Sequence, residues 1–291
     1  MDTGQPAAGT ALHAADHKPC QEPGILNWDL EAIQTAGWVQ TLDYLEELGS
    51  TNDHALLTAS DNRPHPRLIL CNQQQAGRGR GSNRWSVTRG ALTFSLVIEP
   101  ESMGIPRERW PTLSVAVGGA LCAAIQPLIP EADVRLKWPN DVYANGRKLG
   151  GILVEVPAVT PPRLVIGIGV NVLNSATTAP EELRSRMVAL CDLQATTTGT
   201  SSRSVVLAAI LNELKQHLVR LENDPLSLAP HWRSLCFLTG RTVTLDDGVR
   251  TVTGACQGID DDGALRIYTE FGPQRCLGGT IRGYEPLKDS D

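Results

Sequence analysis

Residues 137–156 read KWPNDVYANGRKLGGILVEV, and this stretch decides the fold. An alternating apolar run at 134–136 leads into it, and Pro139 removes a ladder donor, so the pattern predicts a strand that ends at a polar turn. Asn145-Gly146 is a strong hairpin signal, because both residues tolerate a positive φ. We therefore expect a short strand before this turn, and the apolar run 152–156 as a further strand after it.

The same stretch concentrates charge around the expected hairpin. Lys137, Asp141 and Lys148 lie close together in sequence, and Gly150-Gly151 leaves backbone without side chains beside them. Two cations, a carboxylate and exposed backbone suit a site for an anion and a metal ion. A charged hairpin on a solvated sheet edge fits the same residues, so this stretch leaves both interpretations open.

The composition is that of an ordinary globular protein. The chain has 291 residues, 41% hydrophobic and 20% charged, with a net charge of −6, which predicts one large domain or two unequal ones. The negative charge gives no general attraction to nucleic acid, although local basic patches can exist. The apolar stretch 113–129 contains Gly118-Gly119 and Pro127, so we expect a buried helix there and no membrane span.

The cysteines and the N-terminus bear on the compartment. Seven cysteines are scattered without a C-x-x-C pair or a histidine cluster at zinc spacing, which predicts reduced thiols in a cytoplasmic protein. No basic segment followed by an apolar run marks a secretory signal. We expect residues 1–36 to be a flexible tail with a short helix at 27–36, too short and too poor in cations for a helix-turn-helix DNA reader.

From residue 37 onward the pattern predicts an α+β fold with a mixed β-sheet packed with helices. We expect a large domain at 37–236 and a small C-terminal β-barrel at 237–291, where short β-like runs alternate with Asp/Gly turns. The expected strands of the large domain, besides those named above, are 39–48, 67–72, 91–98 and 163–172. Its expected helices are 50–60, 109–129, 179–190, 203–221 and 227–236, and the expected strands of the barrel are 241–245, 249–257, 264–269 and 274–277.

Ser50-Thr51-Asn52 follows Gly49 and supplies residues that commonly cap a helix. Simple capping explains these residues without any ligand. In the expected strand 163–172, Gly167 and Gly169 would allow a close approach to the backbone. Asn171 sits in this otherwise apolar run and must find polar partners, either backbone groups or a ligand.

A second informative stretch, QQQAGRGRGSNRW at 73–85, alternates glycine with Arg78 and Arg80. Its glycines disfavour regular structure, so we expect a mobile loop. Such a loop can wrap backbone N–H groups and two guanidinium groups around an anion. Its spacing matches neither a P-loop nor a dinucleotide fingerprint. A disordered linker and an RGG-like nucleic-acid segment are the alternatives, and Trp85 with the flanking strands argues against the linker.

The chemistry available to these residues is limited. The sequence has no recognisable Ser/His/Asp triad, reactive-cysteine motif or paired carboxylates. Lysines and arginines with one carboxylate can position substrates and stabilise charge, which suits transfer at a phosphate.

These motifs, in this order, resemble those of the biotin–protein ligases: Ser50-Thr51-Asn52, QQAGRGR with Trp85, KWPNDVYANGRKLGGILVE and IGIGVNV. The resemblance runs from about residue 40 to 172. It implies a class II synthetase-like catalytic domain with an SH3-like C-terminal barrel. It also implies a two-step reaction, in which biotin and Mg-ATP give biotinyl-5′-AMP and pyrophosphate, and the biotinyl group then passes to a lysine of a biotin carboxyl carrier domain.

The resemblance implies a role for each matching residue. Lys148, Arg80, Asp141 and Lys137 would be catalytic, with Asp141 also holding Mg²⁺ or receiving the proton of the incoming lysine. The biotin site would comprise Ser50, Thr51, Asn52, Gln74, Arg78, Gly79, Arg80 and Lys148. The nucleotide site would comprise Arg80, Trp85, Lys137, Asn140 and Asn171.

The chain also differs from the family motif at one place, and two other functions fit its residues. After GRGR the chain continues with Gly81-Ser82-Asn83, where the family often has further glycine and basic residues, which predicts a more flexible closing loop. We expect a ligase of the monofunctional type without a DNA-binding domain, with no DNA or membrane partner, as a monomer or homodimer. A lipoate–protein ligase and a non-catalytic biotin or nucleotide sensor are the rival functions.

Overall fold

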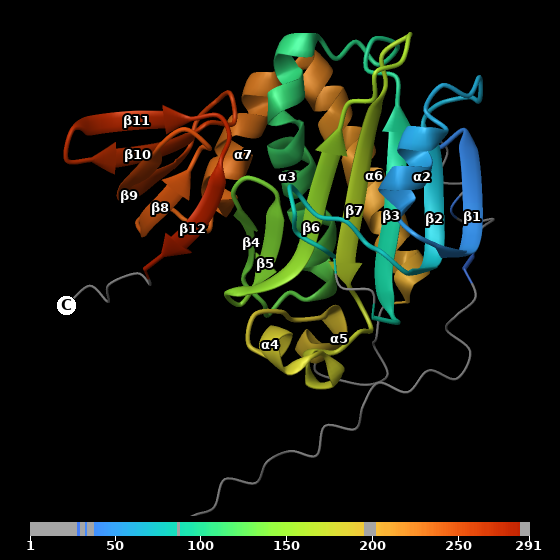
Figure 1. Cartoon of the computed structure of the whole chain (residues 1–291), viewed down its shortest axis with the longest axis horizontal. Coiled ribbons are helices and arrows are strands. Elements are labelled where there is room, and N and C mark those ends of the chain that lie inside the picture. The colour runs from blue at the N-terminus through green and yellow to red at the C-terminus, as the bar shows by residue number, and fades with distance from the viewer. Residues whose placement is uncertain (1–27, 30–32, 34–37, 86–87, 195–201, 286–291) are drawn as a thin grey trace, which may run out of the picture.

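The computed structural model describes residues 28–29, 33, 38–85, 88–194 and 202–285. The expected tail, most of the expected helix at 27–36 and the segment 195–201 lie outside them. Seven strands form the main sheet, in the order β1-β2-β3-β7-β6-β5-β4 (Figure 1). They are β1 (Thr41–Leu48), β2 (Arg67–Gln74), β3 (Ala91–Ile98), β4 (Val134–Lys137), β5 (Asp141–Ala144), β6 (Arg147–Glu155) and β7 (Leu164–Asn171). Because β1 and β2 run parallel and the other neighbours antiparallel, the predicted mixed sheet is confirmed.

The hairpin between β5 and β6 forms as the sequence predicts. Asn145 and Gly146 have φ of 47° and 75°, the positive values that a tight two-residue hairpin turn needs. The strand after the turn is longer than expected, because β6 begins at Arg147 and includes the Gly-Gly pair. A register shift between Val142 and Tyr143 accommodates the extra residue.

Helices cover both faces of the main sheet, and alternate strand residues serve the two faces. Leu68 and Leu70 belong to the large core formed with α3 (Leu113–Ile125) and α6 (Arg203–Asn223). Ile69, between them in β2, belongs to a smaller apolar cluster under α2 (Thr51–Leu57). Helices α3 and α6 therefore cover one face of the sheet, and α2 lies on the opposite face, close to the polar motifs.

The segment Arg107–Leu128 is long and apolar enough to cross a membrane by length and composition, yet 67% of its most apolar window is buried. It consists of α3 flanked by the 3₁₀ turns η1 (Arg107–Thr112) and η2 (Gln126–Leu128). Gly118 lets the helix approach closely, because a Cβ there would collide with Leu136 of β4. This is the core helix expected from the sequence.

The expected helix at 179–190 is wrong. The chain forms the turn η3 (Ala176–Thr178), a short α4 (Glu181–Arg184) and a short α5 (Leu190–Leu193), with an extended segment between the two helices. Lys148 N donates to Arg186 O (2.9 Å) and Val188 N donates to Lys148 O (3.0 Å). Because β7 stops pairing with β6 at Gly150, this segment takes over the free backbone of β6, and sheet pairing outweighs the local helical preference.

The C-terminal domain follows η5 (Pro225–Ser227) and α7 (Leu228–Leu235). It is an antiparallel sheet with the order β11-β10-β9-β8-β12, as expected for a small β domain. Its strands are β8 (Thr242–Asp246), β9 (Thr251–Ile259), β10 (Leu265–Thr269), β11 (Gly272–Cys276) and β12 (Thr280–Tyr284). Strand β12 was not predicted from the sequence. The indole N–H of Trp138 donates to Gly263 O and that of Trp232 to Asp260 O, both at 3.0 Å, so this domain is anchored on the large one.

Candidate active site

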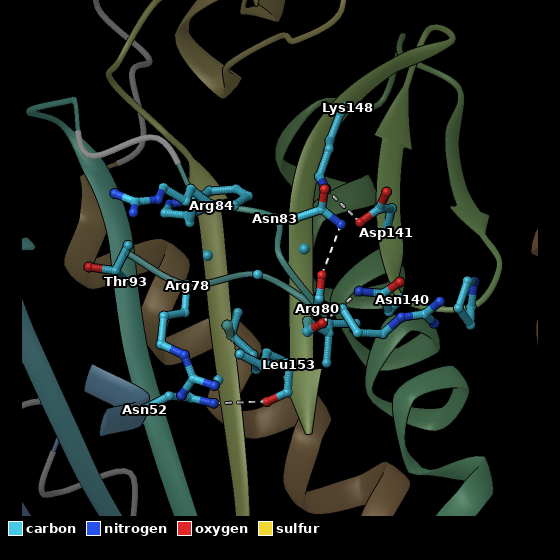
Figure 2. A pocket seen from close by; sticks show the side chains of 18 of the residues that line it. Asn52, Arg78, Arg80, Asn83, Arg84, Thr93, Asn140, Asp141, Lys148 and Leu153 are labelled. Atoms are coloured by element: carbon cyan, nitrogen blue, oxygen red, sulfur yellow. Dashed lines mark hydrogen bonds and ion pairs between the residues drawn. The ribbon is translucent and has the colours of Figure 1, made fainter. Parts of the chain in front are cut away.

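One cavity of about 290 Å³ gathers the residues that the sequence analysis selected (Figure 2). Its wall combines α2, the loop after β2, the β5–β6 hairpin, β7 and the start of β12. Of the predicted site residues, all line the cavity except Asn171: they are Ser50, Thr51, Asn52, Gln74, Arg78, Gly79, Arg80, Trp85, Lys137, Asn140, Asp141 and Lys148. The tertiary fold thus joins three motifs that are far apart in sequence.

The N-terminus of α2 forms one end of the cavity. Ser50 is the N-cap, and its hydroxyl accepts from the backbone N–H of Asp53 (3.4 Å), so the capping interpretation holds for this residue. Thr51 is buried and binds another element instead: its backbone N–H and its hydroxyl donate to Gln74 Oε1 at 2.7 and 3.2 Å. Gln74 is thereby held with its amide oxygen against the helix.

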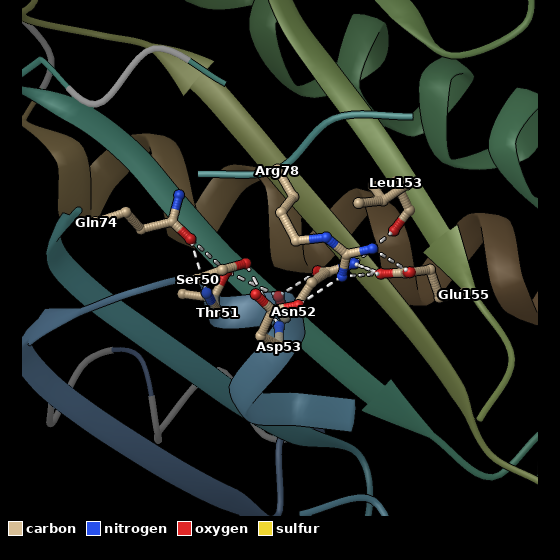
Figure 3. Close-up of polar contacts among 9 residues, drawn as sticks. Ser50, Thr51, Asn52, Asp53, Gln74, Arg78, Leu153 and Glu155 are labelled. Atoms are coloured by element: carbon tan, nitrogen blue, oxygen red, sulfur yellow. Dashed lines mark hydrogen bonds and ion pairs between the residues drawn. The ribbon is translucent and has the colours of Figure 1, made fainter. Parts of the chain in front are cut away.

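Asn52 is the centre of a buried polar network (Figure 3). Its side-chain amide donates to Glu155 Oε2 (2.8 Å) and to Leu153 O (3.3 Å). Its amide oxygen accepts from the hydroxyl of Ser95 (2.6 Å). Gly167 makes room for it, since a Cβ at that position would collide with the Asn52 amide. The close approach expected at Gly167 is therefore made by a side chain of the protein.

Arg78 is held by two carboxylates on different elements. Its guanidinium lies 2.6 Å from Asp53 Oδ1 and 2.8 Å from Glu155 Oε1 (Figure 3). The hydrogen bond to Glu155, followed by that to Asp53, raises the pKa of Arg78 above its ordinary value against the effect of burial. Arg78, Asp53 and Glu155 thus fix the glycine-rich loop to α2 and β6.

The glycine-rich loop itself folds into a small hairpin. Arg78 and Arg84 form an antiparallel bridge, and Gly79 N donates to Asn83 O (2.9 Å). Gly81, with φ of 64°, occupies a turn position that a side chain would disfavour. The amide of Asn83 donates to Arg80 O (2.9 Å) and closes the turn. Greater mobility of this turn in solution stays a prediction.

Arg80 extends from this hairpin to the C-terminal domain. Its guanidinium donates to Gly279 O and, at 3.1 Å, to Thr280 Oγ1 at the start of β12. Burial lowers the pKa of Arg80 from its ordinary value, and the nearby charge of Asp141 opposes that effect. Arg80 is therefore half-buried between the two domains, beside the hairpin carboxylate.

Trp85 forms a wall in the middle of the cavity. Its indole packs on Gly169 and Gly151, where added Cβ atoms would collide with it or touch it. The Nζ of Lys148 lies 5.9 Å from the ring centroid, and the indole N–H is buried without a hydrogen-bond partner among the described residues. The second expected glycine approach, at Gly169, is thus made by Trp85. Contact of Trp85 with the nucleotide stays a prediction.

The β5–β6 hairpin forms the cationic end of the cavity. Lys148 Nζ lies 2.7 Å from Asp141 Oδ1, and Lys137 Nζ donates to the hydroxyl of Tyr143 at 3.0 Å. Lys137 also lies over the rings of Tyr143 (4.9 Å) and Tyr284 (5.3 Å). Burial raises the pKa of Tyr143 to about 12. Lys137, Asp141 and Lys148 therefore line one cavity together, and binding of an anion and a metal ion there stays a prediction.

Two predicted asparagines have partners within the protein. The side-chain amide of Asn140 donates to Ile152 O (2.8 Å), while the residue still lines the cavity. Asn171 is buried outside the lining, and its amide donates to Val188 O (3.2 Å) and Lys148 O (3.4 Å). It therefore joins the strand of Lys148 to the extended segment, and a direct contact with nucleotide receives no support from this geometry.

Several residues of the site were not predicted from the sequence. Thr93 lines the cavity and Ser95 supports Asn52. They are polar residues two apart in an apolar strand, which places both on one face, so this signal could have been recognised. Arg186 and Thr280 also line the cavity. Their segments were assigned to a helix or to no element, so no pattern pointed to them.

The donors around Asp141 suit a metal ion only as a companion of the nucleotide. Among the described residues, no group of three or more His, Cys, Asp or Glu side chains could hold a metal ion. A single carboxylate beside a cation is the kind of partial site that Mg²⁺ uses when phosphates supply its other ligands. Asp141 fits that role, since it is the carboxylate in the cavity wall.

Known proteins share this architecture. Residues 44–171 match the Biotin/lipoate A/B protein ligase family, and residues 238–281 match the Biotin protein ligase C terminal domain. The chain is 35% identical over 234 residues to the biotin--[acetyl-CoA-carboxylase] ligase of Mycobacterium tuberculosis, covering 79% of this chain and 84% of that protein. It is 29% identical over 246 residues to the bifunctional ligase/repressor BirA of Escherichia coli, covering 81% and 72% of the two chains.

Among solved structures, the biotin protein ligase from Aquifex aeolicus in complex with biotin and ATP superimposes with a TM-score of 0.72. That comparison has 27% sequence identity and covers 84% of this chain and 99% of the other. The two family matches contain the cavity-lining residues except Arg186, and the C-terminal β domain up to residue 281.

Proposed function

The chain belongs to the biotin/lipoate A/B protein ligase family, and on that premise we propose that it is a biotin–protein ligase. It activates biotin with ATP to biotinyl-5′-AMP, releasing pyrophosphate, and then transfers the biotinyl group to a lysine of a biotin carboxyl carrier domain. The observation that carries this proposal is the cavity itself, which joins a buried hydroxyl and amide cluster to Lys148, Arg80 and Lys137. An uncharged ring with polar edges suits the hydroxyl and amide cluster, and phosphates suit the lysines and arginine.

Residues at the α2 end bind and orient biotin. Ser50, Thr51, Asn52 and Gln74 offer hydroxyl and amide groups to the ureido ring, and several of these groups are already fixed by partners in the protein. Such prior ordering reduces the entropy lost on binding. The glycine backbone of β6 and β7, on which Trp85 packs, supplies the wall along which the biotin side chain extends, and Trp85 itself is assigned to the nucleotide, as the resemblance implies.

The first chemical step is attack of a biotin carboxylate oxygen on the α-phosphorus of ATP. The bond from that phosphorus to the bridging oxygen of the β-phosphate breaks, and pyrophosphate leaves. Lys148 stands where it can neutralise the carboxylate and α-phosphate, while Arg80 and Lys137 attract phosphate oxygens. Fixed cations that face developing charge in a water-poor site stabilise the transition state.

In the second step, the amine of the carrier lysine attacks the acyl carbon and AMP leaves. The amine must lose a proton, and Asp141 is the carboxylate in the cavity wall that can accept it. Its ion pair with Lys148 keeps this oxygen at the reacting end of the cavity. Mg²⁺ bound with ATP would supply charge neutralisation on the phosphates, with Asp141 as its protein ligand.

The remaining expectations belong to this proposal. Cys71, Cys122, Cys191, Cys236, Cys256 and Cys276 are all free thiols, which supports a reducing, cytoplasmic location. We propose domain limits at 36/37 and 236/237, and the second falls between α7 and β8. The absence of DNA and membrane partners, and a monomeric or dimeric state, stay predictions.

The test is incubation of the full chain with labelled biotin, Mg-ATP and a biotin carboxyl carrier domain. We expect label on the carrier that survives denaturation and depends on the carrier lysine. Tight binding of biotin without covalent label would favour the sensor function and overturn the proposal. ATP–pyrophosphate exchange that depends on lipoate and not on biotin would show a lipoate–protein ligase instead, although the match to the biotin ligase C-terminal domain favours biotin.

A further inference from the structure

Arg186 occupies a position that the proposed function leaves unexplained. It lies in the extended segment between α4 and α5, where its carbonyl accepts from Lys148 N (2.9 Å). Val188 completes the pairing by donating to Lys148 O (3.0 Å). Two ladder hydrogen bonds thus fix the segment 186–188 along Lys148, with Met187 as its register partner, and the side chain of Asn171 reinforces the same junction. Arg186 is therefore positioned together with Lys148.

The side chain of Arg186 lines the cavity and is exposed. Within the part of the chain that the structure describes, its guanidinium has no hydrogen bond or ion pair. Tyr143, whose hydroxyl contacts Lys137, lines the same cavity, and the positive charge of Arg186 opposes the rise in the pKa of Tyr143 that burial causes. Arg186, Lys137, Lys148 and Tyr143 thus line the same cavity.

The carboxylates near the cavity neutralise only one of these three cations. Asp141 pairs with Lys148, while Glu155 and Asp53 pair with Arg78 at the other end. Lys137 has a neutral phenol as its partner, and Arg186 has none among the described residues. The chain as a whole carries a net charge of −6, so this excess of cations is local. A cleft lined by one sign of charge attracts ligands of the opposite sign.

We propose that Arg186 binds the β- and γ-phosphates of ATP and the pyrophosphate that leaves in the first step. This inference rests on the proposed function, and it gives the polyphosphate a ligand outside the sequence motifs. Its guanidinium offers a planar pair of donors that can bind two phosphate oxygens at once, which a lysine does less well. Because Arg186 and Lys148 both line the cavity, the two cations can bind phosphates of the same nucleotide.

The inference is tested with Arg186→Gln and Arg186→Lys in the full chain. Calorimetric titration with inorganic pyrophosphate, ATP and biotin is compared with steady-state KM values for each substrate. For Arg186→Gln we expect about 10-fold weaker binding of pyrophosphate and ATP, with biotin affinity unchanged. Arg186→Lys should recover part of the loss, because it restores the charge without the paired donors.

Arg147→Gln is the matched control. Arg147 carries the same charge one residue before Lys148, but it does not line the cavity. This variant should bind pyrophosphate like the unaltered protein. The inference is overturned if Arg186→Gln binds pyrophosphate as tightly as the control does. It is also overturned if the only change is a higher KM for the carrier domain, which would show that Arg186 contacts the carrier. If the unaltered protein shows no biotin-dependent exchange between ATP and pyrophosphate, the proposed function is refuted. The pyrophosphate titration would still test Arg186.

Discussion

The two ends of the cavity differ in burial and in how far their polar groups are paired within the protein. At the α2 end, Thr51 and Asn52 are buried, and their polar atoms have partners in Gln74, Ser95 and Glu155. At the hairpin end, the cations are more exposed and are only partly neutralised: the Lys148 side chain is 37% exposed, against 20% for its partner Asp141. One end is organised before a ligand arrives, and the other keeps charge available for the ligand.

This difference follows from what each end is proposed to bind. A neutral ring gains little from free charge, so recognition must come from hydrogen-bonding groups held at the correct positions. A polyphosphate brings its own charge and metal ion, so cations without full protein partners suit it, although they repel one another in the free protein. Substitutions at the two ends should therefore differ in size, in the substrate affected and in their response to salt.

The largest effect is expected at the hairpin end. Lys148→Ala or Arg80→Ala should slow adenylate formation at least about 100-fold, since cations that stabilise a transition state in a dry site contribute about 3 kcal/mol or more. Pyrophosphate release from biotin and ATP measures this step. Release at the rate of the unaltered protein would remove the catalytic role assigned to that residue. Arg147→Ala serves as a charge control outside the cavity.

A smaller effect is expected at the α2 end. Asn52→Ala leaves Ser95 and Glu155 without a shared partner and removes an amide from the biotin site. Loss of a buried hydrogen-bond partner costs about 2 kcal/mol, so biotin should bind about 30-fold more weakly. Titration with biotin in the absence of nucleotide measures this effect. A comparable loss of ATP affinity would show that the two ends are not separate.

Glu155 connects the buried polar network to the glycine-rich loop at the α2 end, because it contacts both Asn52 and Arg78. Glu155→Gln keeps an acceptor near Asn52 but removes the charge that holds Arg78. We expect about fivefold weaker biotin binding, which corresponds to about 1 kcal/mol for a partly exposed ion pair. Asp53→Asn is the comparison, since it removes only the second partner of Arg78. Tighter biotin binding by Glu155→Gln would mean that Glu155 restrains Arg78 from the ligand.

Tyr143 permits a finer test of the hairpin end. Tyr143→Phe removes the hydroxyl that accepts from Lys137 Nζ and keeps the ring below the cation. A single hydrogen bond contributes about 0.5–1.5 kcal/mol, so the KM for ATP should rise about threefold while the KM for biotin stays constant. Tyr268→Phe, at an exposed position in β10, is the control. An unchanged KM for ATP would show that the hydroxyl does not position Lys137.

The smallest expected effect is that of salt. Raising ionic strength from about 0.05 to about 0.5 M shortens the Debye length and should raise the KM for ATP about twofold, because the hairpin cations are partly exposed. The KM for biotin should change less, since neutral buried groups dominate its site. Steady-state rates at constant Mg²⁺ measure both. An equal response of the two substrates would contradict the contrast drawn between the ends.

Local patterns were enough to predict much of the fold. The Asn145-Gly146 turn, the β1, β3 and β7 strands and the long apolar helix depend on turn chemistry and periodicity over a few residues. The predicted site residues also meet in one cavity, with Asn171 beside it. These features succeed because each is encoded within a short segment and agrees with the global fold.

Errors occur where distant partners decide the structure. The segment at 186–188 has a helical pattern, yet it pairs with Lys148 where β7 has ended. Strand β12 is short and contains glycine, and its neighbour β8 lies more than 30 residues earlier in sequence. Neither pairing leaves a periodic signal in the segment concerned, because the backbone hydrogen bonds depend on which strand edge is free.

The sequence by itself determined the hairpin, the helix-capping turn, the glycine-rich loop and the types of residue available for binding and catalysis. Tertiary structure alone decided their partners: Asn52 meets Ser95 and Glu155, and Arg80 reaches Thr280 of the C-terminal domain. It also placed Arg186 beside Lys148. The physical reason is that turns and helix caps depend on neighbouring residues, whereas a site depends on the pairing of chain segments that are distant in sequence.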